Sequence, residues 1–202
     1  MRVFIGLPVP RDFFCSSPGN FWVLQEMYRS WHWTTEENLH ITIAFLGDID
    51  DRGLDLLGEV VSAATEDAAA IPFDTGSVVT LPPGPMRRAK VLALEIAKGK
   101  NHMASLAAKI EACLAAAGNR EGYPFRPAER RVYTPHITLA RKGRRPASGF
   151  SLREELGETP LELNLQGLAD RVVIYKSELR PYNSGGHGGG HKYTPLTIYN
   201  LL

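Results

Sequence analysis

The sequence predicts an α+β protein in which mostly antiparallel strands are interspersed with a few helices. The 202-residue chain is 44% hydrophobic and 22% charged, which is typical of a globular protein with a sizeable core. Segments with the alternating apolar pattern of strands outnumber segments with the helical spacing of apolar residues. No proline-, glycine- or serine-rich linker divides the middle of the chain, so we expect a single domain over residues 1–202.

The first half is expected to alternate strands and helices. Residues 2–7 form a short apolar strand, and residues 20–29 a helix. Residues 39–46, LHITIAFL, alternate and are rich in β-branched side chains, which indicates a strand. Residues 51–70 place their leucines and valines on one helical face, and Pro72 stops that helix.

The second half begins with two strands, over residues 73–81 and 90–96, joined by the turn PPGPMRR. A helix is predicted over residues 101–117, with Gly118 at its C-terminal end. The segment HITLAR at residues 136–141 is another strand. The remaining expected elements are a helical turn at residues 150–156 and extended segments at residues 161–165, 171–175 and 193–202.

The segment HITIA at residues 40–44 recurs as HITLA at residues 136–140, each on a predicted strand that follows a loop. Strict alternation places the His, Thr and Ala side chains on one face of each strand. It places the second, fourth and sixth side chains, which include Phe45 and Arg141, on the other face. Two such strands side by side would present two imidazoles and two hydroxyls to one cleft.

Two imidazoles and two hydroxyls suit acid–base cleavage of a phosphodiester. Histidine titrates near neutrality, so one ring can take a proton from water while the other protonates the leaving oxygen. The hydroxyls of Thr42 and Thr138 can hydrogen-bond phosphate oxygens. A zinc site would need a third ligand, and none of the other four histidines stands at ligand spacing from His40 or His136. We therefore expect no metal and no cofactor.

With these motifs the chain resembles the two-histidine phosphoesterase superfamily, and most of all its RNA 2′,3′-cyclic phosphodiesterases, historically called 2′-5′ RNA ligases. The resemblance covers nearly the whole chain. Residues 33–47, WTTEENLHITIAFLG, are similar to the family's first motif and its lead-in. Residues 133–141, YTPHITLAR, are similar to the second, and residues 173–179, VIYKSEL, to the strand that follows.

The resemblance implies a bilobal fold, in which two pseudo-symmetric halves lay curved antiparallel sheets around a central cleft with helices outside. It implies hydrolysis of an RNA terminal 2′,3′-cyclic phosphate to the 2′-phosphate, with His40 as acid and His136 as base, although the near-symmetry allows these roles to be exchanged. Thr42 and Thr138 would hold the phosphate oxygens. Arg141 would join them only if a twist or bulge turns it inward.

The net charge of +1 conceals an asymmetry between the two halves of the chain. Residues 1–80 hold 4 basic and 12 acidic side chains, whereas residues 81–202 hold 19 basic and 10 acidic ones. Basic residues flank the second motif, where an RNA backbone could be bound through its phosphates. The candidates for RNA binding are Arg126, Arg130 and Arg131, with Tyr123 and Phe125 as stacking platforms.

The expected partner is RNA with a 2′,3′-cyclic phosphate end, such as a tRNA fragment, or a small cyclic nucleotide. Weak, reversible 2′-5′ RNA ligation is expected as a side activity of the same groups. Two alternatives remain open at this point: a module that only binds nucleotides or RNA ends, and a phosphodiesterase for ADP-ribose cyclic phosphate. The sequence shows no apolar run of membrane-spanning length and no signal peptide, and its two cysteines form no disulfide framework. We expect a cytoplasmic monomer without membrane association.

Overall fold

The α+β class is confirmed by the computed structural model, which describes residues 1–10, 13–16, 18–83, 89–125, 132–142, 162–180 and 190–202. One curled antiparallel sheet organises this part of the chain, with the strand order β7-β4-β5-β6-β3-β1-β8-β9 and β2 paired to β6. The strands are β1 (Arg2–Pro8), β2 (His32–Trp33), β3 (His40–Asp48), β4 (Ile71–Leu81), β5 (Val91–Lys98), β6 (His136–Arg141), β7 (Gln166–Ala169), β8 (Arg171–Arg180) and β9 (Gly190–Asn200).

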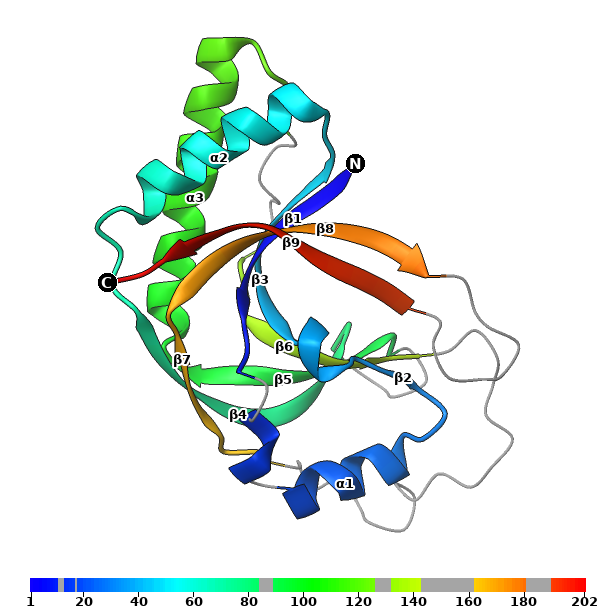
Figure 1. Ribbon diagram of the computed structural model, residues 1–202. Helices are drawn as coiled ribbons and strands as arrows, with labels where there is room; N and C mark the ends of the chain where they lie inside the picture. The colour runs from blue at the N-terminus through cyan, green and yellow to red at the C-terminus, as the bar shows by residue number, and fades with distance from the viewer. Residues whose placement is uncertain (11–12, 17, 84–88, 126–131, 143–161, 181–189) are drawn as a thin grey trace.

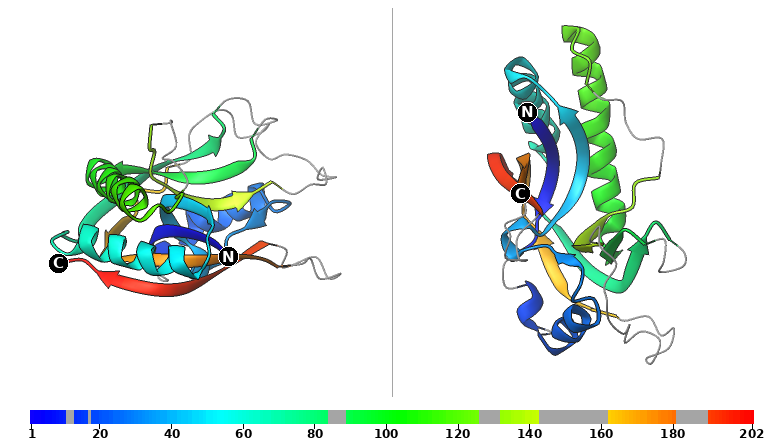
Figure 2. Two further views of the ribbon diagram at one scale, coloured as in Figure 1. Left: turned by 90° about the horizontal axis from the view of Figure 1, so that it is seen from above. Right: turned by 90° about the vertical axis from the view of Figure 1, so that its right-hand side faces the viewer.

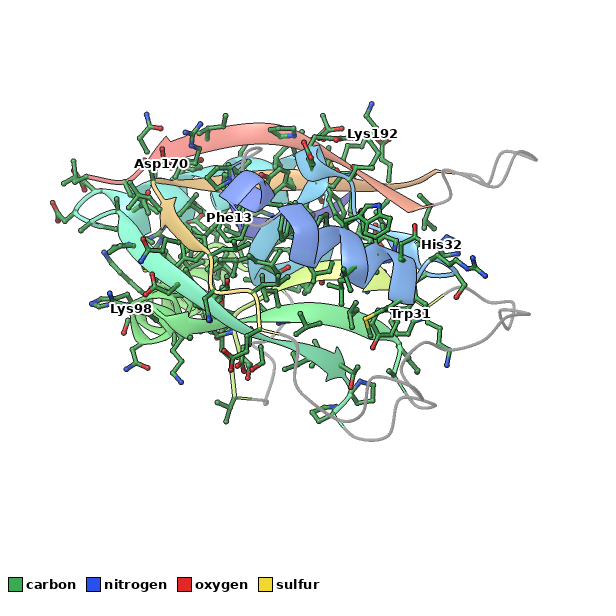
Figure 3. The ribbon with its side chains drawn as sticks, turned by 90° about the horizontal axis from the view of Figure 1, so that it is seen from below. Phe13, Trp31, His32, Lys98, Asp170 and Lys192 are labelled. Carbon is green, nitrogen blue, oxygen red and sulfur yellow. The ribbon has the colours of Figure 1, made fainter. Side chains whose placement is uncertain are left out.

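The helices α2 (Asp51–Thr65) and α3 (Lys100–Glu121) lie against each other and cover one face of the sheet (Figures 1 and 2). Their apolar stripes join the strands in one large buried cluster, in which Leu57, Met103 and Ile110 are fully enclosed. The third helix, α1 (Pro18–Met27), lies apart from these two. It is followed by Trp31 and His32, which Figure 3 shows at the opposite end of the molecule from Lys98 and Asp170.

The sheet consists of two halves that meet at its centre. The first half is β3-β1-β8-β9 and the second is β7-β4-β5-β6, with a histidine motif beginning the innermost strand of each. The halves are joined where β3 and β6 pair through Ile41 and Ile137, both of them buried. β3 and β6 then diverge, and β2 takes the place of β3 beside the end of β6. The two pseudo-symmetric halves expected from the resemblance are therefore present.

Three expectations about the elements need correction. Helix α2 ends at Thr65, before the predicted residue 70, and the chain reaches the next strand through a short turn. Helix α3 does not end at Gly118, which lies buried inside it, but continues to Gly122 with a left-handed φ of 63°. The short strands β2 and β7 were not predicted. Residues 150–156 lie outside the described residues.

Gly118 is required by close packing rather than by a turn. A β-carbon at this position would lie 2.7 Å from the carbonyl oxygen of Tyr123, which belongs to backbone and cannot move aside easily. The segment after α3 thus folds back directly against the helix. Gly58 of α2 provides a contrast, because a β-carbon there would meet only the Tyr199 hydroxyl at an ordinary 3.4 Å.

We predict that Gly118→Ala destabilises the protein although alanine favours helix by about 1 kcal/mol over glycine. The matched substitution Gly58→Ala should leave the free energy of unfolding unchanged or raise it by up to about 1 kcal/mol. Urea unfolding of both variants measures the two effects. A Gly118→Ala variant at least as stable as the Gly58→Ala variant would contradict this account of the packing.

Candidate active site

The antiparallel register of β3 and β6 brings the two histidine motifs together. Ile41 and Ile137 are paired, and continuing that register by one residue on either side sets His40 opposite Thr138 and Thr42 opposite His136. Side chains directly opposite each other on such strands have β-carbons about 4.5–5.5 Å apart. Each imidazole therefore lies beside the hydroxyl of the other motif, on the face away from the buried isoleucines.

Both histidine rings are held in the same way by the chain that precedes them. Nδ1 of His40 lies 2.7 Å from the carbonyl oxygen of Asn38, and Nδ1 of His136 lies 2.9 Å from that of Thr134. Because a carbonyl oxygen can only accept, Nδ1 carries the proton in both rings. The nitrogen that exchanges protons with a substrate is therefore Nε2 in each.

A bulge follows the threonine at the same position in both motifs. Thr42 pairs with Gly6 and Ala44 with Ile5, which leaves Ile43 unpaired. Thr138 pairs with Ala93 and Ala140 with Leu92, which leaves Leu139 unpaired. Each bulge inserts one residue and reverses the alternation beyond it.

Because of the bulges, the side chains that follow each bulge lie on the faces opposite to those expected from strict alternation. Ala44 and Ala140 lie in the core instead of sharing the histidine face, whereas Phe45 is 51% exposed. Because the alternation is reversed beyond each bulge, Phe45 lies on the same face as His40, and Arg141 lies on the same face as His136. From the sequence, Arg141 could face the phosphate only if a twist or bulge turned it inward. The pairing of β5 with β6 contains such a bulge.

Arg141 connects the two halves of the sheet across the histidine face. Its charge lowers the pKa of Tyr193 on β9, against the larger raising effect of burial, and also acts on His40 and His191. The Tyr193 ring meets the His40 ring edge-on, with centroids 5.0 Å apart. A cation contributed by the second half of the sheet thus lies close enough to the histidine of the first half to lower its pKa.

The His40 ring lies within a small aromatic cluster that is separate from the main core. The centroid of Phe4 is 4.8 Å from that of His40, and Tyr175 stacks on Phe4 at 5.0 Å. Burial among these rings, assisted by the charges of Arg141 and His136, lowers the pKa of His40 to about 4 despite the opposing hydrogen bond to Asn38. His40 is therefore neutral at pH 7 in the free protein.

Tyr133, in the lead-in to the second motif, fastens the first. Its hydroxyl donates a 2.9 Å hydrogen bond to the carbonyl oxygen of Thr42, and burial raises the pKa of the phenol. The two threonine-bearing backbones are thereby tied together at a second point besides the Ile41–Ile137 pair.

The aromatic residues proposed to stack on RNA are not brought to the histidines. The Tyr123 hydroxyl donates to Asp50, which caps α2 by accepting from the backbone of Gly53, and the Phe125 ring packs on Tyr123 at 4.7 Å. Asp50 follows β3 at the end away from His40, about 30 Å along an extended strand of this length. Arg126, Arg130 and Arg131 lie outside the described residues.

Four residues join the site that the sequence pattern did not single out: Phe4, Asn38, Tyr193 and His191. The glycine-rich segment at residues 184–191 obscured His191, which in the structure is part of β9, stacks on Tyr193 and has Nδ1 3.1 Å from the Ser177 hydroxyl oxygen. Phe4, Tyr193 and His191 come from strands distant from the motifs in sequence, so only the register of β1, β8 and β9 reveals them, whereas Asn38 lies in the lead-in of the first motif. In the described part of the chain, no three or more His, Cys, Asp or Glu side chains are grouped so as to hold a metal ion.

The chain belongs to the 2′-5′ RNA ligase superfamily, the two-histidine phosphoesterases. The family model matches residues 31–179, which include both motifs. No curated protein matches the chain in sequence. None of the helices in the described ranges is long and apolar enough to span a membrane.

Several solved structures have the same fold at low sequence identity. TT0787 of Thermus thermophilus superposes with a TM-score of 0.75 at 20% identity, covering 100% of this chain and 98% of its own. LigT of E. coli in complex with 3′-AMP gives 0.69 at 19% identity, over 99% of this chain and 97% of its own. A further structure, described as a phosphoesterase, gives 0.66 at 18%, over 99% and 97%. The curled α+β architecture is therefore shared along the whole chain.

We predict that His40 makes stability depend on pH between its two pKa values. The unfolded chain binds a proton at His40 near pH 6.5, and the folded protein only near pH 4. Stability is therefore lost as the pH falls through this window, by on the order of 3 kcal/mol relative to a variant without the ring. Urea unfolding of the wild type and of His40→Gln at pH 7 and pH 4 measures the difference. Equal pH dependence in both proteins would contradict the burial of His40.

Proposed function

We propose that the protein hydrolyses the 2′,3′-cyclic phosphate at an RNA end to the 2′-phosphate by acid–base catalysis with His40 and His136. One observation carries the proposal. Two imidazoles of the same tautomer lie diagonally on one face of adjacent strands, each opposite the threonine of the other motif. A phosphate held between the two hydroxyls would have one Nε2 on either side, as in-line displacement requires.

The reaction needs one proton removed and one supplied. The oxygen of water attacks phosphorus while the basic ring takes its proton, and the bond from phosphorus to the 3′ oxygen breaks as the acidic ring protonates that oxygen. Thr42 and Thr138 donate hydrogen bonds to the non-bridging oxygens, and Arg141 adds positive charge where negative charge accumulates. Weak 2′-5′ ligation would use the same groups: the 5′-hydroxyl of a second RNA end attacks phosphorus in place of water, and the bond from phosphorus to the 3′ oxygen breaks as before.

The surroundings of the two rings favour one assignment of their roles. His40 is enclosed by aromatic rings and faces Arg141, so that it is neutral at pH 7 and ready to accept a proton. The hydrogen bond that holds His136 lies in a more exposed setting, where a charged ring is better solvated. We therefore assign the base to His40 and the acid to His136, the exchange that the near-symmetry of the motifs allows. A bound phosphate anion raises the proton affinity of His40 toward neutrality.

The residues around the site favour an RNA end over other cyclic phosphates. Phe45 presents an exposed ring on the His40 side, and the base of a single-stranded nucleotide can stack on such a surface. LigT of E. coli, which shares the fold, has been solved with 3′-AMP. Hydrolysis of ADP-ribose cyclic phosphate and binding without turnover remain outcomes of the same assays.

We predict that replacing either histidine with alanine lowers the turnover of a 2′,3′-cyclic-ended oligonucleotide by about 10²–10⁴-fold, the usual contribution of an acid or a base. The rate should not change on addition of EDTA. Conversion of the cyclic end to a 2′-phosphate is measured by phosphorus NMR. Full activity of either variant would overturn the mechanism, whereas tight binding without turnover by the wild type would support a binding module.

The assignment of roles predicts different responses to the leaving group. A nucleoside 3′-(p-nitrophenyl phosphate) releases a stable phenolate that needs no acid, so His136→Ala should regain most of its lost activity on this ester. His40→Ala should lose activity on both substrates, because the base is still required. Rates for the two variants on both substrates test this assignment. If only His40→Ala regained activity on the ester, His40 would be the acid and His136 the base.

A further inference from the structure

The Asn38 side chain connects the C-terminal strand to the first histidine motif. Its Nδ2 donates to the carbonyl oxygen of His191 at 3.2 Å, and its Oδ1 accepts from the backbone nitrogen of Tyr193 at 3.2 Å. Both partners are on β9, 153 and 155 residues further along the chain. The amide thus binds alternate residues of β9, as the backbone of a neighbouring strand would.

The backbone of the same residue holds the catalytic ring. The Asn38 carbonyl oxygen accepts the 2.7 Å hydrogen bond from Nδ1 of His40. Rotation of this peptide group would move the acceptor away from the ring, and the side-chain bonds to β9 resist such rotation. Asn38 also donates a 3.0 Å bond to the Thr35 hydroxyl, which fixes it from the preceding turn.

Among the residues that the structure describes, the carbonyl that holds the second histidine has no equivalent side-chain bond to a distant strand. Thr134 stands where Asn38 stands in the first motif, two residues before the histidine, and its carbonyl oxygen holds Nδ1 of His136. Its hydroxyl, however, donates to the carbonyl oxygen of Val132 in its own segment, at 3.4 Å. The orientation of His40 therefore depends on a distant strand, whereas that of His136 is bonded locally.

We propose that Asn38 is a positioning residue that links β9 to the orientation and tautomer of His40. β9 also carries Tyr193, whose ring packs on His40, so a single strand contacts the ring directly and holds its lead-in through Asn38. Asn38 does not touch the reacting atoms and acts through His40. The inference rests on the proposed function only for its effect on the rate.

The kinetic test compares Asn38→Ala with the wild type on a 2′,3′-cyclic-ended oligonucleotide. We expect kcat to fall by about 10- to 100-fold, as small misplacements of a catalytic group do, and KM to change by less than about threefold. Asn38→Asp keeps an acceptor for the Tyr193 nitrogen but loses the donor to His191, and should fall between the two. Asn164→Ala is the matched control, because that exposed amide bonds only its near neighbour Glu162 among the contacts described.

The structural test does not depend on turnover. Nitrogen NMR of the histidine rings near neutral pH reports which ring nitrogen carries the proton. In Asn38→Ala we expect the His40 signals to move toward a mixture of tautomers while those of His136 stay in place.

Unchanged His40 signals and unchanged kcat would overturn the proposal. So would equal disturbance of both rings accompanied by a loss of folding stability, which would indicate a general structural role. A wild type that hydrolyses no cyclic phosphate but shows the selective change at His40 would contradict the proposed function and leave the positioning role intact.

Discussion

The pairing of β3 with β6 is the constraint on which the rest of the structure depends. It joins the two halves of the sheet through the buried Ile41 and Ile137, and it alone determines that each histidine faces the threonine of the other motif. The helices bury these isoleucines in the main core, and the bond from Tyr133 to Thr42 ties the two motifs together beside them. A shift of either strand by one residue would send the histidine and threonine of that strand into the core.

The sequence was sufficient to predict the α+β class, most of the strands and the two motifs, because alternation and duplication are local signals. It was insufficient for Ala44, Phe45, Ala140 and Arg141, since strict alternation places them on the wrong faces. A bulge is a property of the partner strand as well as of its own, and Gly6 and Ala93 are not adjacent to the motifs in sequence. Gly118 was wrongly predicted to end its helix for a similar reason, because glycine is favoured both at helix ends and where a loop packs closely against a helix.

The two halves share their backbone plan but differ in how they treat their histidines. His40 is enclosed by aromatic rings and bonded, through Asn38, to a strand from the end of the chain. His136 is held by its own lead-in. Duplication provides a symmetric pair of imidazoles, and contacts from distant strands then place the two rings in different surroundings and lower the pKa of His40. Such a difference is what separates an acid from a base at a single pH.

The paired bulges have a consequence for how a substrate can be oriented. A site with two equivalent imidazoles and two equivalent hydroxyls would accept a cyclic phosphate equally well in either direction, and only one direction places the leaving oxygen at the acidic ring. The side chain five positions after each histidine lies on the histidine face and differs between the two motifs. It is the cation of Arg141 in the second motif and the apolar ring of Phe45 in the first. In the proposed reaction the phosphate lies between the two hydroxyls in either direction, so a nucleotide that entered reversed would set its base against the guanidinium instead of the phenyl ring. The extra residue in each strand thereby makes the two orientations of a substrate different, whereas the duplicated motif alone would make them equivalent.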